Sequence, residues 1–529
     1  MKLQKMCLAM AAVLVLGLCA CGGGSTSSSA GSSSSSSGSS SAASIDKTRT
    51  VTFGYSGMPA TLDPTVMLSL AAQVVDDQLY DPLLTRNFDG TFSPRIAKEY
   101  KVSDDALTYT FILDERATFS NGDKITADDV VFSMQYFQAS AQHAYIYKDI
   151  TSMKAVDSKT VEVVFSTPHP TFLASCASTL HLSILCKKAV QQYGSDYGKS
   201  IDKTVCSGAY VATDWQNEVS VTFKARDDYF LGKADIENIK FYKFADTNSA
   251  IVSLQKGDLD IYFSPVSGTA YTTLSSSSNV VLESFPSSRF EDIHFNMKNG
   301  MFTDIRMRQA VAYAVKAEEA LAVGVDNLGK TTRYPGDGHG AIAADPDYTS
   351  PNTISYDLAK AKALVAECGN TGKKVVIKSY STDPYPALNT WLQSVLNSIG
   401  LDSSVELMER AAWLDACNNS QIEILILSWN GASYDMDESL GNTLKSANAG
   451  TSGNYGFYSN STVDGLFAAA NKLTDVNQRA AKYKEIIDQM WKDVPLIPLY
   501  QTTNVYPHSS QIKTDNARSY RLYGYQWTK

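Results

Sequence analysis

The chain has 529 residues and a net charge of −9, from 46 lysines and arginines against 55 aspartates and glutamates. A chain of this length can bury the cores of two or three domains. The acidic balance, and the lack of any lysine- or arginine-rich run, exclude nucleic acid as an expected partner.

Residues 1–20 have the pattern of an export signal. Lys2 and Lys5 precede an apolar run, residues 6–18, that is short for a membrane span. A bacterial lipoprotein cleavage site requires an aliphatic residue three positions before the modified cysteine and a small residue directly before it. Cys21 meets both conditions. We therefore expect Cys21 to be the lipidated first residue of the mature protein; the alternative is an ordinary signal peptide with incidental cysteines.

After Cys21, residues 22–45 are almost all glycine, serine, alanine and threonine. Such a segment buries too little apolar surface to offset the entropy lost on ordering, so residues 21–45 are predicted to be a flexible tether. A glycine- and serine-rich coil of this length has an end-to-end distance of roughly 25–30 Å. No second long apolar segment follows. We expect a globular domain held at the outer face of the cell membrane by its lipid anchor.

Short strands alternate with helices through the rest of the chain, which favours an α/β architecture. Period-2 and helical apolar patterns distinguish the two kinds of element. Strands are predicted at 51–55, 107–113, 161–165, 219–223, 374–380 and 422–428, and helices at 126–138, 304–320, 357–367, 387–399 and 475–491.

The first predicted strand leads into the loop GYSGMP, residues 54–59. In open α/β sheets ligands bind beyond the carboxyl ends of the strands. Glycines in such a loop let backbone amides approach a ligand. We expect Ser56, Gly57 and Met58 to face a ligand cleft; the alternative is a turn that only joins a strand to a helix.

Residues 104–137 combine a strand, a tight turn and a capped helix. Apolar side chains alternate along residues 107–113, Asn121-Gly122 supplies a turn, and Thr126 with Asp129 forms a T-x-x-D helix start. The apolar stripe of this helix consists of Val130, Met134 and Phe137.

A second candidate edge follows the apolar run at residues 422–428, which is predicted to be a buried central strand. The next residues supply an aromatic stacking surface and several hydrogen-bonding groups, as a small-molecule site requires. The alternative is a surface loop with its tryptophan packed in the core. The ligand-binding residues predicted here are Trp429, Asn430, Gly431, Ser433, Tyr434 and Asp435.

The cysteines and histidines indicate neither a metal site nor a catalytic centre. The chain contains no C-x-x-C or Cys/His metal spacing and no H-E-x-x-H, G-x-S-x-G or Walker A motif. We therefore expect no metal, no cofactor and no enzymatic activity; a surface-anchored hydrolase is the rival class. Cys176 and Cys186 are close enough to pair, but the odd number leaves at least one free thiol. The cysteines beyond Cys21 are Cys176, Cys186, Cys206, Cys368 and Cys417.

Beyond these patterns, the order of residues in 107–132 resembles the signature of the family-5 extracellular solute-binding proteins, the dipeptide and oligopeptide receptors of ABC importers. The matching residues are Tyr109, Phe111, Leu113, Phe119, Gly122, Thr126, Ala127, Asp128, Asp129, Val130 and Phe132. Further strings resemble the family in the correct order: LDP at 62–64, YDPLL at 80–84, SGAY at 207–210, ARDDYFLGKADIENIKF at 225–241, QKGDLD at 255–260, HFNMKNGMFTDIRMRQAVAYAV at 294–315, residues 355–369, and VPLIPLY at 494–500.

This resemblance implies a two-lobed periplasmic-binding-protein type II fold with an extra inserted subdomain. Lobe I would comprise 46–79, 206–285 and 496–529, the inserted subdomain 80–205, and lobe II 286–495, with hinges near 285 and 495. The implied protein is a monomeric receptor that captures peptides by lobe closure and delivers them to a permease energised by ATPase subunits.

One departure from the family concerns the ligand. The family's peptide receptors usually place an aspartate about three residues after the tryptophan, where it pairs with the ligand's α-ammonium group. Here Ala432 or Ser433 stands there, and Asp435 matches a different family aspartate. Asp435 is the candidate substitute; alternatively the ligand is a non-peptide solute such as an oligosaccharide or a metal chelate.

Overall fold

The structure is a computed structural model that describes residues 46–528 except 67–68, 88–90, 170, 337–340, 383, 431–434, 452 and 514–525. Residues Ile45–Lys529 form one compact unit. The predicted export signal, Cys21 and the tether lie outside the described residues.

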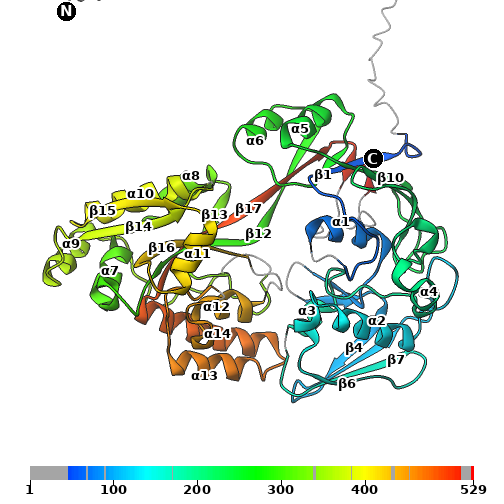
Figure 1. Ribbon diagram of the computed structural model, residues 1–529, viewed down its shortest axis with the longest axis horizontal. Coiled ribbons are helices and arrows are strands. Elements are labelled where there is room, and N and C mark those ends of the chain that lie inside the picture. Colours follow the sequence, from blue (N-terminus) through cyan, green and yellow to red (C-terminus); the bar gives the residue numbers. More distant parts are fainter. Residues whose placement is uncertain are drawn as a thin grey trace, which may run out of the picture. The chain divides into compact units, whose positions relative to one another are not determined.

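The main sheet has the strand order β16 (Ile424–Asn430), β12 (Val280–Phe295), β17 (Leu496–Ser509), β11 (Ile261–Tyr262), β1 (Val51–Tyr55), β10 (Asn238–Lys243), β9 (Ser220–Ala225) and β8 (Tyr210–Gln216), and β13 (Gly329–Thr331) pairs with β17 (Figure 1).

Strand β1 lies in the half of this sheet that corresponds to the predicted lobe I. It pairs in parallel with β10 and β11, whereas β8, β9 and β10 are antiparallel neighbours. The fully buried Phe53 of β1 stacks on Phe241 of β10 at a centroid distance of 4.2 Å. The strands predicted at 51–55 and 219–223 are confirmed. The helices of this region are α1 (Leu70–Leu79), α5 (Thr247–Lys256) and α6 (Gly268–Ser275).

The predicted inserted region contains a separate antiparallel sheet with the order β4 (Ala97–Val102), β5 (Thr108–Leu113), β7 (Thr160–Phe165) and β6 (Ile150–Ala155). Helix α2 (Ala127–Ala139) begins at Thr126 with the predicted capping box to Asp129, and its apolar stripe is buried. Gly122 has a φ of +86°, which the predicted turn requires. The remaining elements here are β2 (Leu84–Arg86), β3 (Phe92–Pro94), α3 (Phe172–Ser175), α4 (Lys187–Tyr193) and 3₁₀ turns at Ala144–Tyr147, Gly194–Asp196 and Ile201–Lys203.

Two long strands, β12 and β17, connect the two halves of the main sheet. They pair side by side from Val280↔Ser509 to His294↔Leu496, and the register shifts between Pro286 and Phe290. Figure 1 shows both strands running side by side. A β-bulge or similar irregularity typically bends a strand, so we expect a bend here, next to the point where β12 begins to pair with β16.

The region predicted as lobe II is built around β16 and the parallel pair β14 (Lys374–Tyr380) and β15 (Asp402–Met408). Strand β16 is buried as predicted, but within the described chain it ends the hydrogen-bonded ladder rather than lying in its centre. The single helix predicted at 304–320 is wrong, because Val315 adopts an extended conformation and ends the first of two helices. The helices are α7 (Ile305–Ala314), α8 (Ala317–Val325), α9 (Leu358–Glu367), α10 (Tyr385–Ser398), α11 (Arg410–Asn418), α12 (Met436–Leu444), α13 (Ser461–Ala470) and α14 (Val476–Asp493), with 3₁₀ turns at Met301–Thr303 and Ser446–Asn448.

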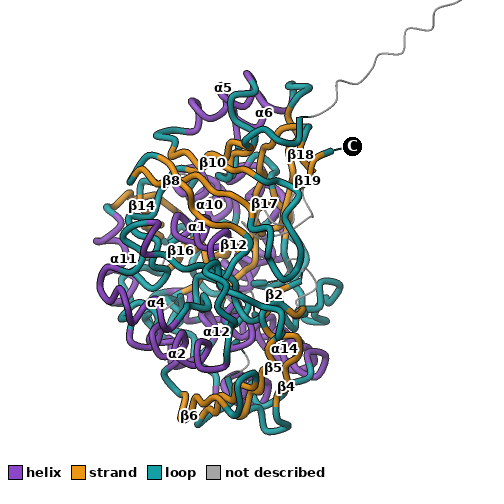
Figure 2. The backbone as a smooth tube through the Cα atoms, turned by 90° about the vertical axis from the view of Figure 1, so that its right-hand side faces the viewer, coloured by secondary structure: helices purple, strands orange, loops and turns teal. Residues whose placement is uncertain are grey.

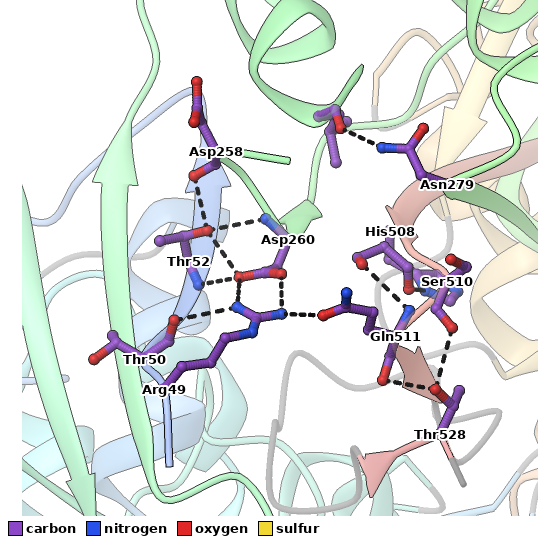
Figure 3. Close-up of polar contacts among 12 residues, drawn as sticks. Arg49, Thr50, Thr52, Asp258, Asp260, Asn279, His508, Ser510, Gln511 and Thr528 are labelled. Carbon is purple, nitrogen blue, oxygen red and sulfur yellow. Dashed lines mark hydrogen bonds and ion pairs between the residues drawn. The ribbon is translucent and has the colours of Figure 1, made fainter. Parts of the chain in front are cut away.

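The first described residues are fixed to the main sheet by polar contacts (Figure 3). The Arg49 guanidinium donates to both carboxylate oxygens of Asp260, at 2.8 and 2.6 Å, and to the side-chain oxygen of Gln511 at 3.0 Å. Asp260 also accepts from the backbone amide of Thr52 at 2.8 Å. Figure 2 shows the C-terminus beside the short pair β18 (Ile512–Lys513) and β19 (Gln526–Trp527).

The hydrophobic cores follow the predicted division only in part. One core runs from Val51 through the inserted region to Phe263, so lobe I and the inserted subdomain share it. A second core, from Ile293 to Tyr500, includes Ile497, Leu499 and Tyr500 of β17, whereas Val505 belongs to another core with α5 and α6. By this criterion the chain leaves the second core within β17, a few residues after the predicted boundary at 495.

All five cysteines that follow the predicted tether are free thiols, so Cys176 and Cys186 are not paired. None of the helices in the described part of the chain has both the length and the apolar character needed to cross a bilayer.

Candidate ligand-binding site

The sequence predicts a ligand at the carboxyl end of β16, and we take this end together with that of the neighbouring β14 as the candidate edge. Strand β16 ends with Trp429 and Asn430, which lie opposite Phe290 and Arg289 of β12. Strand β14 ends at Tyr380. The predicted site residues Gly431, Ser433 and Tyr434 lie outside the described residues. The edge is therefore defined by Trp429, Tyr380 and the part of β12 nearest the register shift.

Trp429 is half-buried, and its indole ring lies against Gly453. A Cβ atom added to Gly453, which has a φ of +103°, would lie 3.1 Å from two atoms of the indole ring, so only glycine fits beneath it. The indole Nε1 is buried without a hydrogen-bond partner among the described residues. A Trp placed in this way keeps a polar atom for a ligand or a water molecule, since buried indole N–H groups usually have a partner.

The contacts of Asp435 indicate a role in the stability of the fold. Its side chain is fully buried, and Arg479 donates to both of its oxygens, at 2.6 and 2.8 Å. The same carboxylate caps α12 by accepting from the backbone amide of Asp437 at 2.8 Å. A ligand ammonium group could reach this carboxylate only by displacing Arg479, itself almost fully buried.

The predicted loop after β1 divides into three different environments. Ser56 is exposed, and its hydroxyl accepts from Ser264, which follows β11, at 3.5 Å. Gly57 lies against α1, where an added Cβ would be 2.9 Å from that of Ala71. Met58 is buried in the core. Of these three residues only Ser56 presents a side chain to solvent, at the carboxyl ends of the parallel strands β1 and β11.

The sequence analysis missed a charged pair on β12. The Nε and Nη2 atoms of Arg289 donate to one oxygen of Glu291, at 2.9 and 2.7 Å, and Nε also donates to the Ser428 hydroxyl at 2.8 Å. The Tyr385 hydroxyl of α10 lies 3.4 Å from Nη2 and 3.5 Å from the other oxygen of Glu291. The Arg-x-Glu spacing places both side chains on one face of a strand, and that was the available signal.

The electrostatics of this pair are set by burial. Glu291 is fully buried, whereas the Arg289 side chain is 34% exposed. Burial raises the pKa of Glu291 to about 7, although Arg289 and the Ser428 hydroxyl oppose the rise. Burial and the nearby Glu291 also raise the pKa of the Tyr385 hydroxyl. Tyr385 packs against Tyr380 at a ring-centroid distance of 4.4 Å, so aromatic surface borders the guanidinium.

Within the described chain, no group of three or more histidine, cysteine, aspartate or glutamate side chains could hold a metal ion. The side chains at this edge suit recognition of a solute through one cation, hydroxyl groups and aromatic rings.

Comparison with known proteins assigns the chain to a family. The model of the bacterial extracellular solute-binding proteins, family 5 Middle, matches residues 91–451, more than half of the chain. The glutathione-binding protein GsiB of Salmonella typhi is 26% identical over 464 residues, which cover 85% of this chain and 89% of that protein.

Solved structures show the same fold at low sequence identity. HbpA2 from Haemophilus parasuis has a TM-score of 0.83 at 22% identity, covering 91% of this chain and 100% of that one. The periplasmic murein tripeptide-binding protein MppA, in its unliganded open form, has a TM-score of 0.81 at 20% identity, covering 91% and 97%. The predicted α/β fold of the type II periplasmic binding proteins is confirmed. The chain belongs to family 5 of the bacterial extracellular solute-binding proteins, which serve ABC transporters as binding proteins and not as enzymes.

Proposed function

We propose that this protein is the lipid-anchored receptor of an ABC importer for short peptides or peptide-like solutes. The observation that carries the proposal is the edge formed by Trp429, Tyr380 and Arg289. It offers aromatic surface at the carboxyl ends of β14 and β16 and a cation on the neighbouring β12 whose side chain is one-third exposed. The names of the relatives support it, since one binds glutathione and another a murein tripeptide. Both of those ligands carry carboxylate groups.

The proposed mechanism is closure of two lobes about β12 and β17. We propose the first crossing between the lobes near residue 285, as predicted from the sequence. We place the second crossing within β17, a few residues after the predicted position 495, because the two ends of β17 belong to different hydrophobic cores. Ligand contacts that form only when the lobes close shift the equilibrium toward the closed form. The closed form then delivers the solute to the permease, whose ATPase subunits supply the energy.

We propose that Cys21 carries the lipid and that residues 22–45 tether the monomeric receptor near its permease. The pattern around Cys21 and the composition of the tether support this proposal. A serine- and glycine-rich coil gives the domain freedom to reach a membrane partner at a distance of roughly 25–30 Å.

A second candidate is the same receptor for a non-peptide solute. The observation in its favour is that the Asp435 carboxylate is occupied by Arg479, so it is not free to bind the ammonium group of a peptide. An oligosaccharide stacked on Trp429, or a metal chelate with carboxylate arms, requires no such partner.

Native mass spectrometry of residues 46–529, purified from cells without refolding, tests the proposed function. Adducts spaced by amino-acid masses, or a single peptide mass, are the expected result. Adducts spaced by hexose masses, or one discrete non-peptide mass, would replace the peptide proposal with the second candidate.

A further inference from the structure

We infer that Arg289 is the binding point for a carboxylate group of the solute and that Glu291 holds its guanidinium in position. This inference rests on the proposed function, because it names the chemistry of a ligand for the same edge. It requires a solute with at least one carboxylate and assigns the complementary cation to β12.

The guanidinium is oriented on one side and open on the other. Its Nε and Nη2 atoms are held by Glu291, and Nε also donates to Ser428. The Nη1 atom donates to no group among the described residues, and a third of the side chain is exposed. A carboxylate that approaches from this side can accept a charge-assisted hydrogen bond from Nη1. It can also accept from Nη2 by replacing the 3.4 Å contact of that nitrogen with the Tyr385 hydroxyl, which gives the two parallel bonds in which guanidinium and carboxylate match best.

Two other arginines show what a purely structural arginine looks like in this chain. Arg226 and Arg308 are almost fully buried, and in each of them Nε, Nη1 and Nη2 all donate to protein acceptors. Their hydrogen-bonding capacity is used on backbone carbonyls, plus a carboxylate in Arg226. Arg289 is also held by protein acceptors, at Nε and Nη2. It differs because its Nη1 atom has no acceptor among the described residues.

The surroundings favour a ligand group over bulk water. The Tyr385 and Tyr380 rings pack together beside the guanidinium, and Trp429 lies one residue beyond Ser428. Aromatic surface lowers the local dielectric constant and strengthens a charge-assisted hydrogen bond relative to the same bond in water. Glu291 is shielded on every side, so a ligand meets the cation and not the carboxylate behind it.

The charge state of Glu291 predicts how the affinity for a carboxylate depends on pH, which is a second way to test the inference. The titratable and polar groups near Glu291 are Arg289 and Asp292 on β12, Ser428 on β16, Tyr380 on β14, Tyr385 on α10 and Tyr500 on β17. Burial raises the pKa of Glu291 to about 7. Below that pH Glu291 is protonated and the Arg289 charge is uncompensated, so affinity for a carboxylate should increase as the pH falls from 8 to 6. The Glu291→Gln variant should bind with little dependence on pH over this range.

Protection of arginines from phenylglyoxal, mapped by mass spectrometry, tests the inference on the compact unit Ile45–Lys529. The probes are tri-alanine, tri-alanine amide, glutathione and the simple carboxylates acetate and tricarballylate. Arg306 is the internal control, because it also pairs with an acidic side chain two residues away but is half exposed on α7. We expect probes with free carboxylates to protect Arg289 and not Arg306, and the amide to protect neither.

The outcomes separate the two proposals. Protection by a peptide acid but not by its amide supports both. Protection by simple carboxylates without protection by any peptide probe supports the carboxylate site and counts against a peptide ligand. Equal protection by acid and amide overturns the carboxylate site and leaves a peptide receptor. No protection by any carboxylate probe overturns the inference.

Affinities of two variants complete the test. Arg289→Gln should weaken binding of the protective carboxylate probe by about 10- to 100-fold, because a hydrogen bond to a charged group is lost. Since this change leaves Glu291 buried without its cation, the double variant Arg289→Gln/Glu291→Gln keeps the site neutral and should fold. A double variant that binds the probe as tightly as the unaltered protein would overturn the inference.

Discussion

Replacement of Asp435 by asparagine should destabilise the protein strongly, because it breaks a buried ion pair. The Asp435 side chain is fully buried and that of Arg479 is 4% exposed, and two hydrogen bonds of 2.6 and 2.8 Å join them. Removing one partner of such a pair costs about 3–5 kcal/mol, since the other charge is left without compensation. The Nε atom of Arg479 already lacks a hydrogen-bond partner among the described residues, so the guanidinium would keep the Tyr483 hydroxyl and a neutral asparagine oxygen but no compensating charge.

Asparagine retains the side-chain oxygen that caps α12, and alanine does not. Asp435→Ala should therefore cost about 1 kcal/mol more than Asp435→Asn. Asp304→Asn is the matched control, because Asp304 also caps a helix, α7, and pairs with an arginine, but in an exposed setting. Its expected cost is below about 1 kcal/mol.

Urea unfolding of residues Ile45–Lys529, with linear extrapolation to water, measures these differences. The double variant Asp435→Ala/Arg479→Met should recover part of the lost stability, because no buried charge is then left unpaired. If Asp435→Asn costs no more than Asp304→Asn, the buried-pair reasoning fails. Asp435 should then be tested as an amine partner, by comparing the affinities of the variant for a free peptide and its N-acetyl form.

Three further expectations concern the ligand edge, acid stability and a helix cap. Trp429→Ala should lower the affinity for the co-purified solute by more than about tenfold, because aromatic anchors dominate binding energies; an unchanged adduct in native mass spectra would remove Trp429 from the site. Burial and the neighbouring His143 lower the pKa of His181 from its ordinary 6.5 to about 4. The unfolded chain then binds that proton more tightly, so stability should fall as the pH drops from about 6.5 to 4. Thermal unfolding of His181→Gln should show a flatter pH profile in that window, and an unchanged profile would contradict it. Thr126→Ala removes the capping box of α2 and should cost about 0.5–2 kcal/mol in urea unfolding; Thr126→Ser, which keeps the hydroxyl, should cost much less.

Local rules predicted the elements whose apolar pattern and end signals agree. The capping box at Thr126 and the turn at Gly122 both formed, because each depends on neighbours within a few residues. The break between α7 and α8 at Val315 was missed, since the apolar residues continue across it at helical spacing. The break depends on how each helix packs, which a single sequence does not display.

The position of the candidate site remains a prediction, and the contacts of its residues involve distant parts of the chain. Trp429 does lie at the end of a buried strand, as the apolar run at 422–428 indicated. Asp435 looked like a ligand group because it follows that strand closely, but its partner, Arg479, lies 44 residues further along the chain. Arg289 and Glu291 were passed over for the same reason, because the Ser428 and Tyr385 contacts that define their surroundings come from other parts of the chain.

The location of Arg289 connects ligand contact to the proposed hinge. Arg289 lies within the register shift between Pro286 and Phe290, and its carbonyl accepts from the Thr502 hydroxyl of β17 at 3.4 Å. The carbonyl of Ser287, also within the shifted segment, accepts from the Gln501 side chain. Both crossing strands therefore fix the backbone from which the guanidinium projects. If the lobes close about these strands as proposed, a carboxylate bound there would contact the proposed hinge segment, so the solute would bias closure directly from the crossing strands and not only by bridging two distant surfaces.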